Sequence, residues 1–194
     1  MKRSLKWLID DWQWPQAALF CGIVCLVLLG AIFPILNLAT LIVALQLPNY
    51  MIHQFEEHHN DRFRTFVNLQ MGNGREVLTR NATFFINSVG VWGVNLCSLA
   101  LMTHLHEGFG LFAIYLTLVN GVIHCIPAMI QRTYNPGLWT AIVVFLPVSA
   151  LGCYHLWNHD ILFHAAGLGT SILIHGMIIV YLKTQLRKAP ASAP

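Results

Sequence analysis

The chain has little charge for its length. Only 10% of its 194 residues are Asp, Glu, Lys or Arg, whereas 56% are hydrophobic, and the mean hydropathy is +0.60. Soluble domains carry about 25% charged residues, so this composition excludes an ordinary soluble globular domain. The formal net charge of +3 is small, and we infer no nucleic-acid partner from it.

Cysteine is also scarce, and its placement argues against two kinds of site. The five cysteines form no Cys-x-x-Cys pair, and each lies inside an apolar segment. Such spacing fits neither a disulfide framework nor a cysteine-ligated metal cluster. We therefore expect buried thiols that pack as small apolar side chains, at Cys21, Cys25, Cys97, Cys125 and Cys153.

Long apolar runs dominate the sequence, at 16–33, 35–55, 82–103, 110–130, 138–156 and 161–182. A helix needs about 20 predominantly apolar residues to cross a hydrocarbon core of roughly 30 Å. The predicted fold is therefore all-α, a polytopic membrane helical bundle of about six transmembrane helices. We treat 1–194 as a single integral-membrane domain with a disordered tail at about 183–194. The first run lacks a clear cleavage site, so we expect a retained helix and not a signal peptide.

The basic residues lie on one side of this predicted topology. With six crossings, both tails share a side with the connections at 58–80 and 131–137, and these segments contain all eleven Lys and Arg residues. By the positive-inside rule, both termini are expected in the cytoplasm. The prediction is a multi-pass protein of the cell (inner) membrane, surrounded by membrane lipids.

Polar side chains interrupt the second apolar run in a regular pattern. On a helix with 100° per residue, one stripe contains Gln46, Asn49, His53, Glu57, Asn60 and Arg64. Ionisable groups inside a membrane are costly unless they are partnered or face a cavity. The stripe therefore predicts an interior polar site at the cytoplasmic end of this helix. Pro48 is expected to kink the helix one turn before His53.

Histidines from two later runs fall at a similar depth. Counted from the cytoplasmic helix ends, His53, His124 and His175 lie roughly 8–12 Å below the surface at 1.5 Å per residue. Two imidazoles and one carboxylate with an open position are typical of catalytic zinc, and the same donors suit iron or manganese. We predict a divalent metal, zinc favoured, held by His53, Glu57 and His124, with His175 as a fourth ligand or outer partner.

Neighbouring residues receive supporting roles in this prediction. Glu56 lies one position off the stripe, where it is expected to act as the general base on a water at the metal. Asn49 lies on the stripe, and Asn120 is expected to orient His124.

Three further features are assigned no role in chemistry. His58 and His59 are expected to face the interface or solvent, and Thr140 is expected to serve helix packing. The connection at 58–80 is either a lid over a lipid access route or a solvated connector.

The segment His53 to Glu57, HQFEE, is similar to the signature motif of a known protein family. With the later segments NGVIH at 120–124 and YNPG at 134–137, and with Thr140, it resembles the HXXEE-motif family of small multi-span membrane proteins, found mainly in bacteria. The similarity covers roughly 45–150. It implies that these residues form the functional region and adds Tyr134 to the supporting set. No activity is established for that family, so the resemblance leaves the reaction open.

The function favoured by these residues is a metal-dependent membrane enzyme that hydrolyses a lipidic or other hydrophobic, membrane-delivered small molecule. A di-iron membrane oxidase or hydroxylase is an alternative, because Glu56 and His59 form an E-x-x-H pair, although such bundles normally contain two. A proton or metal-ion transporter is a second alternative, although no second copy of the stripe is present. A partner-binding scaffold is the third.

Overall fold

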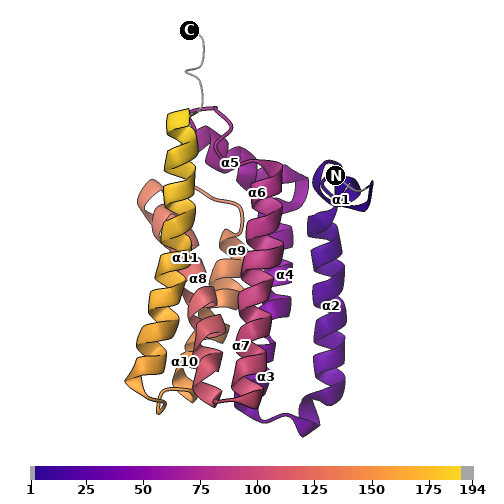
Figure 1. The fold of residues 1–194 in the computed structure, drawn as a ribbon, viewed down its shortest axis with the longest axis vertical. Helices are drawn as coiled ribbons and strands as arrows, with labels where there is room; N and C mark the ends of the chain where they lie inside the picture. Colours follow the sequence, from indigo (N-terminus) through magenta and orange to yellow (C-terminus); the bar gives the residue numbers. More distant parts are fainter. Residues whose placement is uncertain (1–2, 189–194) are drawn as a thin grey trace.

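The computed structural model describes residues 3–188, and within this range it contains helices and turns but no β-strand. The helices stand side by side as a bundle, which confirms the all-α prediction (Figure 1). The longer helices are α2 (Trp14–Ile32), α4 (Gln46–His58), α7 (Trp92–His104), α8 (Gly110–Gln131), α10 (Leu146–His155) and α11 (Ile161–Lys188). The shorter helices are α1 (Arg3–Ile9), α3 (Leu38–Ala44), α5 (Arg62–Gln70), α6 (Arg80–Phe85) and α9 (Leu138–Thr140). Single turns of 3₁₀-helix are η1 (Phe33–Ile35), η2 (His59–Asp61) and η4 (Glu107–Phe109), and the π-helical segments are η3 (Ile86–Val91) and η5 (Ala141–Phe145).

Five helical segments are long and apolar enough to cross a membrane. They are Trp14–Ile35, Arg80–His104, Glu107–Gln131, Leu138–His155 and Ile161–Lys188. Large apolar side chains on them are exposed, as lipid-facing residues should be, for example Phe20, Val27 and Ile172. The chain therefore has the character of a multi-span membrane protein. Six spans were predicted, and the apolar run at 35–55 is the one that does not form a single long helix.

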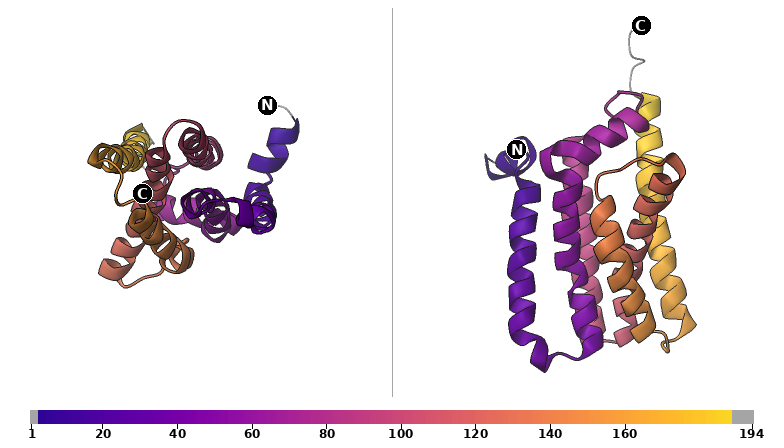
Figure 2. Two further views of the ribbon diagram at one scale, coloured as in Figure 1. Left: turned by 90° about the horizontal axis from the view of Figure 1, so that it is seen from below. Right: turned by 180° about the vertical axis from the view of Figure 1, so that it is seen from behind.

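The second run forms two helices, α3 and α4, that meet at Leu45. Pro48 has no amide hydrogen to donate to the carbonyl of Ala44, which weakens the helix one turn earlier. The division at Leu45 lies where Pro48 weakens the helix. α4 packs along α2 (Figure 2), and the two helices approach closely at Gly22, where a Cβ atom would lie 2.9 Å from the Cβ atom of Met51.

α5 lies across one end of the bundle (Figure 2). The chain turns into it through Asn60 (φ 56°) and Asp61 (φ 59°), two residue types that tolerate the left-handed conformation. Val67 of α5 packs in a cluster with Leu78 and with Leu182 of α11. α5 is therefore a separate helix that covers the end of the bundle where α4 and α11 terminate.

One buried side-chain amide fixes the connection between α5 and α6. Asn68 Oδ1 accepts hydrogen bonds from the amides of Val77 (3.0 Å) and Leu78 (2.8 Å), and its Nδ2 donates to the carbonyl of Leu78 (3.1 Å). Asn68→Ala leaves these buried backbone groups without partners, so we expect a loss of about 2–4 kcal/mol of unfolding free energy. Thermal unfolding in detergent tests this, with the exposed Thr65→Ala on the same helix as control. Equal melting temperatures for the two variants would contradict the prediction.

Both described ends of the chain lie at the same end of the bundle (Figure 1). α11 continues to Lys188, so residues 183–188 are helical and do not belong to a disordered tail as expected. Lys, Gln, Leu and Arg are good helix formers, and basic residues are favourable at a helix C-terminus. The rest of the expected tail, 189–194, lies outside the described residues.

The cysteines depart from one expectation. All five carry free thiols, but none is buried: Cys21 and Cys97 are exposed, and Cys25, Cys125 and Cys153 are partly exposed. A membrane bundle presents apolar surface outward to lipid as well as inward, so an apolar position is not necessarily a buried one.

Candidate metal centre

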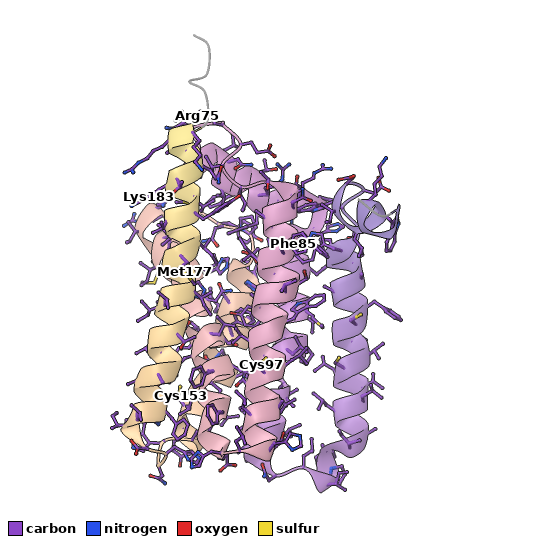
Figure 3. The ribbon with its side chains drawn as sticks, viewed as in Figure 1. Arg75, Phe85, Cys97, Cys153, Met177 and Lys183 are labelled. Carbon is purple, nitrogen blue, oxygen red and sulfur yellow. The ribbon has the colours of Figure 1, made fainter. Side chains whose placement is uncertain are left out.

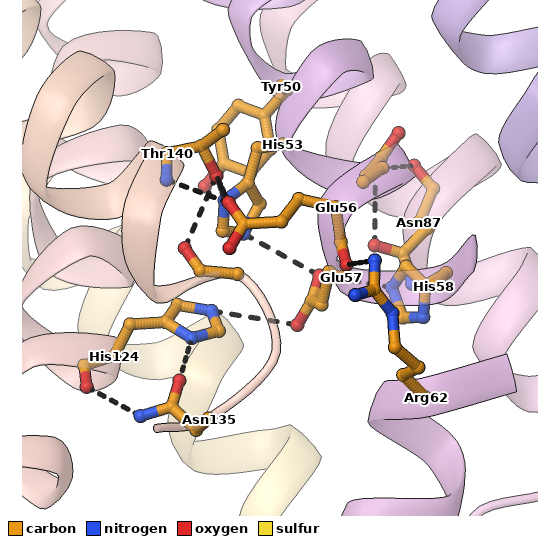
Figure 4. Close-up of polar contacts among 12 residues, drawn as sticks. Tyr50, His53, Glu56, Glu57, His58, Arg62, Asn87, His124, Asn135 and Thr140 are labelled. Carbon is orange, nitrogen blue, oxygen red and sulfur yellow. Dashed lines mark hydrogen bonds and ion pairs between the residues drawn. The ribbon is translucent and has the colours of Figure 1, made fainter. Parts of the chain in front are cut away.

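Three buried side chains from two helices converge on one point. His53 and Glu57 lie one turn apart on α4, so their side chains share a face, and His124 approaches from α8 (Figure 4). Glu57 Oε2 lies 3.6 Å from His53 Nε2, and Glu57 Oε1 lies 3.6 Å from His124 Nε2. One ligand atom from each residue lies within 4.8 Å of the others. Three of the four predicted ligands are thus brought together.

The separations within this group suit the ligands of one ion. With bonds of about 2.0–2.2 Å, ligand atoms around a tetrahedral metal lie roughly 3–4 Å apart. At 3.6 Å, however, neither histidine is close enough to Glu57 for an N–H···O hydrogen bond. The separations therefore leave room for one ion between Glu57 and the two histidines.

Thr140 and Glu56 determine which nitrogen of His53 carries the proton. Thr140 Oγ1 donates to Glu56 Oε2 (2.6 Å) and lies 2.7 Å from His53 Nδ1. A hydroxyl has one hydrogen, and the charged carboxylate is its stronger acceptor. Nδ1 of His53 must then be the donor to Thr140, which leaves the lone pair on Nε2.

Asn135 has the same effect on His124. Its Nδ2 donates to the backbone carbonyl of His124 (2.9 Å), so its Oδ1 faces His124 Nδ1 at 2.7 Å. An amide oxygen only accepts, and Nδ1 of His124 must therefore donate. Nε2 of His124 is again the nitrogen with the free lone pair.

Both free lone pairs face the carboxylate of Glu57. His53 Nε2 has no hydrogen-bond partner within the described residues. Acceptors that face one another in a buried site repel unless a donor or a cation lies between them. Two histidines and one carboxylate with an open position are also a common ligand set of catalytic zinc, and iron and manganese bind the same donors. His53, Glu57 and His124 thus fit a divalent cation chemically as well as geometrically.

Glu56, the predicted general base, has its carboxylate in a dense set of hydrogen bonds. Its carboxylate accepts from the Tyr134 hydroxyl (3.0 Å), the Trp139 amide (3.1 Å), the Thr140 amide (2.7 Å) and Thr140 Oγ1. A carboxylate has about four acceptor positions, and these four bonds fill them. These bonds join the end of α4 to the start of α9, and Thr140 connects Glu56 to His53.

Tyr134, which the resemblance adds to the supporting residues, contacts Glu56. It lies in the loop between α8 and α9, with its hydroxyl hydrogen-bonded to Glu56. Burial and the neighbouring carboxylate raise the pKa of the Tyr134 hydroxyl, which therefore stays protonated and donates.

His58 is buried at the site and does not face the interface or solvent as expected. Its Nε2 lies 3.0 Å from Glu57 Oε2, and its ring packs on Trp14 at a centroid distance of 4.8 Å. Trp12 Nε1 donates to the carbonyl of His58 (2.8 Å). The segment between α1 and α2 therefore covers this end of α4, and His58 becomes a direct partner of Glu57.

Three other predicted residues lie near the group but outside it. His175 lines the same cavity, but its Nδ1 lies 2.8 Å from the carbonyl of Ser171 on its own helix, and it is not among the clustered ligand atoms. Asn120 also lines the cavity, while Asn135 is the residue that orients His124. Asn49 is buried on α4.

Gly137 packs directly against both histidines. It has a φ of 97° at the start of α9, and a Cβ atom there would lie 2.8 Å from His53 Cε1 and 2.9 Å from His124 Cε1. Such contacts are closer than van der Waals packing allows. Only glycine fits here, so the loop between α8 and α9 closes one side of the group.

A cavity of about 340 Å³ adjoins the group on another side. Glu57, His58, His124 and Asn135, which contact one another, form one part of its wall. Most of the remaining wall is apolar and comes from α5, η3, α8 and α11: Phe63, Phe66, Val67, Ile86, Val91, Leu116, Ile123, Pro127, Ile174, Ile178, Ile179 and Leu182. An apolar pocket with a few convergent polar groups is the usual form of a small-molecule site.

Two π-helical segments flank the site. η5 directly follows Thr140, and its Phe145 packs against the ring of His53 at a centroid distance of 4.2 Å. η3 contributes Asn87, whose Oδ1 accepts from Gln54 Nε2 of α4 (3.1 Å). π-Helical turns are rare and occur frequently at functional sites.

Sequence reasoning missed the roles of Thr140, Asn135 and His58. Thr140 and Asn135 were both present in the segments that carry the family resemblance, which was the available signal for them. For His58 the sequence signal was weaker, because its only indication of a role was that it directly follows the predicted ligand Glu57.

Comparison with known proteins gives one result. A family described as "protein of unknown function with HXXEE motif" matches residues 44–151. No curated protein and no solved structure matches the chain significantly. The matched segment covers more than half of the chain and includes His53, Glu57, His124 and the loop with Gly137. The chain therefore belongs to the HXXEE-motif family.

Proposed function

We propose that this protein is a metal-dependent membrane enzyme that holds one divalent ion, zinc in preference to iron or manganese, with His53, Glu57 and His124. The observation that carries the proposal is the hydrogen bonding of the two histidines. Each Nδ1 is held as a donor, so each Nε2 directs a lone pair toward Glu57. Three protein ligands leave a coordination position open, as catalytic sites require.

The reaction class we propose is hydrolysis of a lipidic or other hydrophobic substrate. When bound, the metal supplies Lewis-acid chemistry and lowers the pKa of water. Thr140 and Asn135 hold the two imidazoles in their ligating form, and His58 pairs with Glu57. The apolar cavity binds the hydrophobic part of the substrate and excludes bulk water from the polar end.

We also propose six crossings of the cell (inner) membrane, with both termini in the cytoplasm. α1 and the end of α11 lie at the same end of the bundle, which requires an even number of crossings (Figure 1). α3 and α4 together supply the sixth crossing beside the five long apolar segments. All eleven Lys and Arg residues then lie on the cytoplasmic side, and the metal site faces that side.

A di-iron oxidase fits this geometry less well. The hydrogen bonds of Glu56 occupy the acceptor positions that a second ion would need. His59 is also not part of the ligand group found in the described residues. One ion per chain is therefore the expected stoichiometry.

Metal content tests the proposal. Elemental mass spectrometry of the detergent-purified protein, after incubation with zinc, iron(II) or manganese(II), should find about one ion per chain. Glu57→Gln removes a ligand, so its metal affinity should fall by more than the roughly 10–100-fold that loss of an outer hydrogen bond costs. Glu76→Gln is the matched control, because Glu76 is an exposed carboxylate that pairs with Arg64 (2.6 Å).

Two results would contradict the proposal. One is a folded wild-type protein that binds none of the three ions. The other is a Glu57→Gln variant with unchanged metal content. Either would favour a proton relay through Glu57 and the histidines, or a partner-binding face, over an enzyme.

A further inference from the structure

A groove runs between α11 and the continuous helix formed by α6, η3 and α7. It has a volume of about 510 Å³, and its lining is apolar except for Tyr181. Phe85 of α6 and Met177 of α11, both labelled in Figure 3, belong to this lining. α11 packs mainly along α8, which leaves this side of the bundle open.

The groove adjoins the cavity of the metal centre. The two share a wall of five aliphatic side chains, Ile86, Val91, Leu116, Ile174 and Ile178. Leu116 is buried, but Ile86, Val91, Ile174 and Ile178 are partly exposed. Solvent- or lipid-exposed side chains change rotamer within picoseconds to nanoseconds, so the part of the wall formed by these four can open without movement of the backbone. An apolar route therefore leads from the outer surface of the bundle to Glu57 and His124.

The surroundings of the groove restrict what can occupy it. Both of its sides belong to segments long and apolar enough to cross a membrane, Arg80–His104 and Ile161–Lys188. Its outer residues Phe85 and Met177 are about half exposed, at 48% and 55%. The groove thus faces the hydrocarbon of the bilayer, where the available small ligands are lipid chains.

We propose that this groove binds one alkyl chain of a membrane lipid and guides it sideways from the bilayer to the metal centre. The substrate is then an amphiphile in which an alkyl chain lies close to a hydrolysable polar bond. This placement of the polar bond rests on the proposed metal-dependent function. Binding of the chain in the groove does not, and it can be measured in protein without metal.

The test is photolabelling with a lysophosphatidylcholine that carries a diazirine on its acyl chain, in phosphatidylcholine vesicles that contain the full-length protein. Mass spectrometry should locate saturable labelling on η3 and on the 174–181 segment of α11. Gly90→Leu fills the groove and should reduce this labelling at least 5-fold. Gly93→Leu is the control, because Gly93 is on the same helix with free space around it but does not line the groove.

A second pair of variants tests the opposite side of the groove. Met177→Trp should also reduce labelling, whereas Ile172→Trp, at a similarly exposed position of α11 outside the groove, should not. Size-exclusion profiles identify any variant that fails to fold. Labelling that is spread over the outer face of α2, or that survives both groove variants, would overturn the proposal.

Glu57→Gln distinguishes this inference from the proposed function. If only the metal proposal fails, the wild-type protein binds no ion while saturable groove labelling persists in both proteins. If only the groove proposal fails, the ion is bound through Glu57 but no labelling depends on Gly90 or Met177.

Discussion

Replacing Gly137 by alanine is expected to weaken metal binding at the site strongly. The added Cβ atom would lie 2.8 Å from His53 Cε1 and 2.9 Å from His124 Cε1, so both rings would have to move. Neither ring can retreat freely, because Thr140 and Asn135 hold their Nδ1 atoms at 2.7 Å. The φ of 97° adds backbone strain of about 1–3 kcal/mol for a residue with a side chain. The substitution therefore displaces the ligand atoms of both histidines and also destabilises the loop.

Competition with a zinc-selective fluorescent chelator measures this effect. We expect the zinc affinity of Gly137→Ala to fall at least about 100-fold, at the upper end of the range for outer-shell changes, since both imidazoles are displaced. Gly169→Ala is the control, because no atom lies within 4 Å of its added Cβ and alanine favours the helix. Wild-type affinity in a folded Gly137→Ala protein would show that the loop does not hold the histidines as described.

The ligand group was predictable because it depends on helix geometry. His53 and Glu57 are four residues apart on one helix, so they share a face in any helical fold. His124 was placed at the same depth by counting from its helix end. The same count predicted His175 as a fourth ligand or outer partner. In the structure His175 lines the cavity and is not in the ligand group, because equal depth does not determine how a helix is rotated about its axis.

The hydrogen bonds that orient the two histidines depend on the loop between α8 and α9. The path of this loop cannot be predicted from helical periodicity. Residues 132–137 return over α4 and α8, and this return brings Asn135 to His124 and Thr140 to His53. Nothing in the sequence pattern indicates that the amides of Trp139 and Thr140 donate to Glu56. A sequence pattern locates side chains on a helix, whereas backbone donors from a distant loop appear only in the fold.

His58 was misplaced for a related reason. On an isolated helix it points well away from His53, toward solvent. In the structure, Trp12 and Trp14 cover that side of α4, so the imidazole is buried beside Glu57. Trp12 and Trp14 thus form part of the wall behind the site.

Glu56→Gln is expected to weaken metal binding although Glu56 is not a ligand. The carboxylate accepts two backbone amide hydrogens, from Trp139 and Thr140, and two hydroxyl hydrogens. The glutamine side chain keeps one acceptor oxygen, and its NH₂ group would face donors in place of the other. The start of α9 must then shift, which moves Thr140 away from His53 and Gly137 away from both imidazoles. We expect zinc affinity to fall by about 10–100-fold, as for other outer hydrogen bonds of metal ligands.

The same measurement decides between the two roles considered for Glu56. A general base on a water at the metal contributes nothing to metal affinity, so that role predicts wild-type zinc binding in Glu56→Gln. An anchoring role predicts weaker binding in Glu56→Gln and also in Thr140→Val, which removes the hydroxyl between Glu56 and His53. Thr140→Ser keeps that hydroxyl and should retain most of the affinity. If Glu56→Gln, Thr140→Val and Thr140→Ser all bind zinc as tightly as the wild-type protein, the hydrogen-bond chain to His53 has no effect on the ion. That result would favour the catalytic role of Glu56.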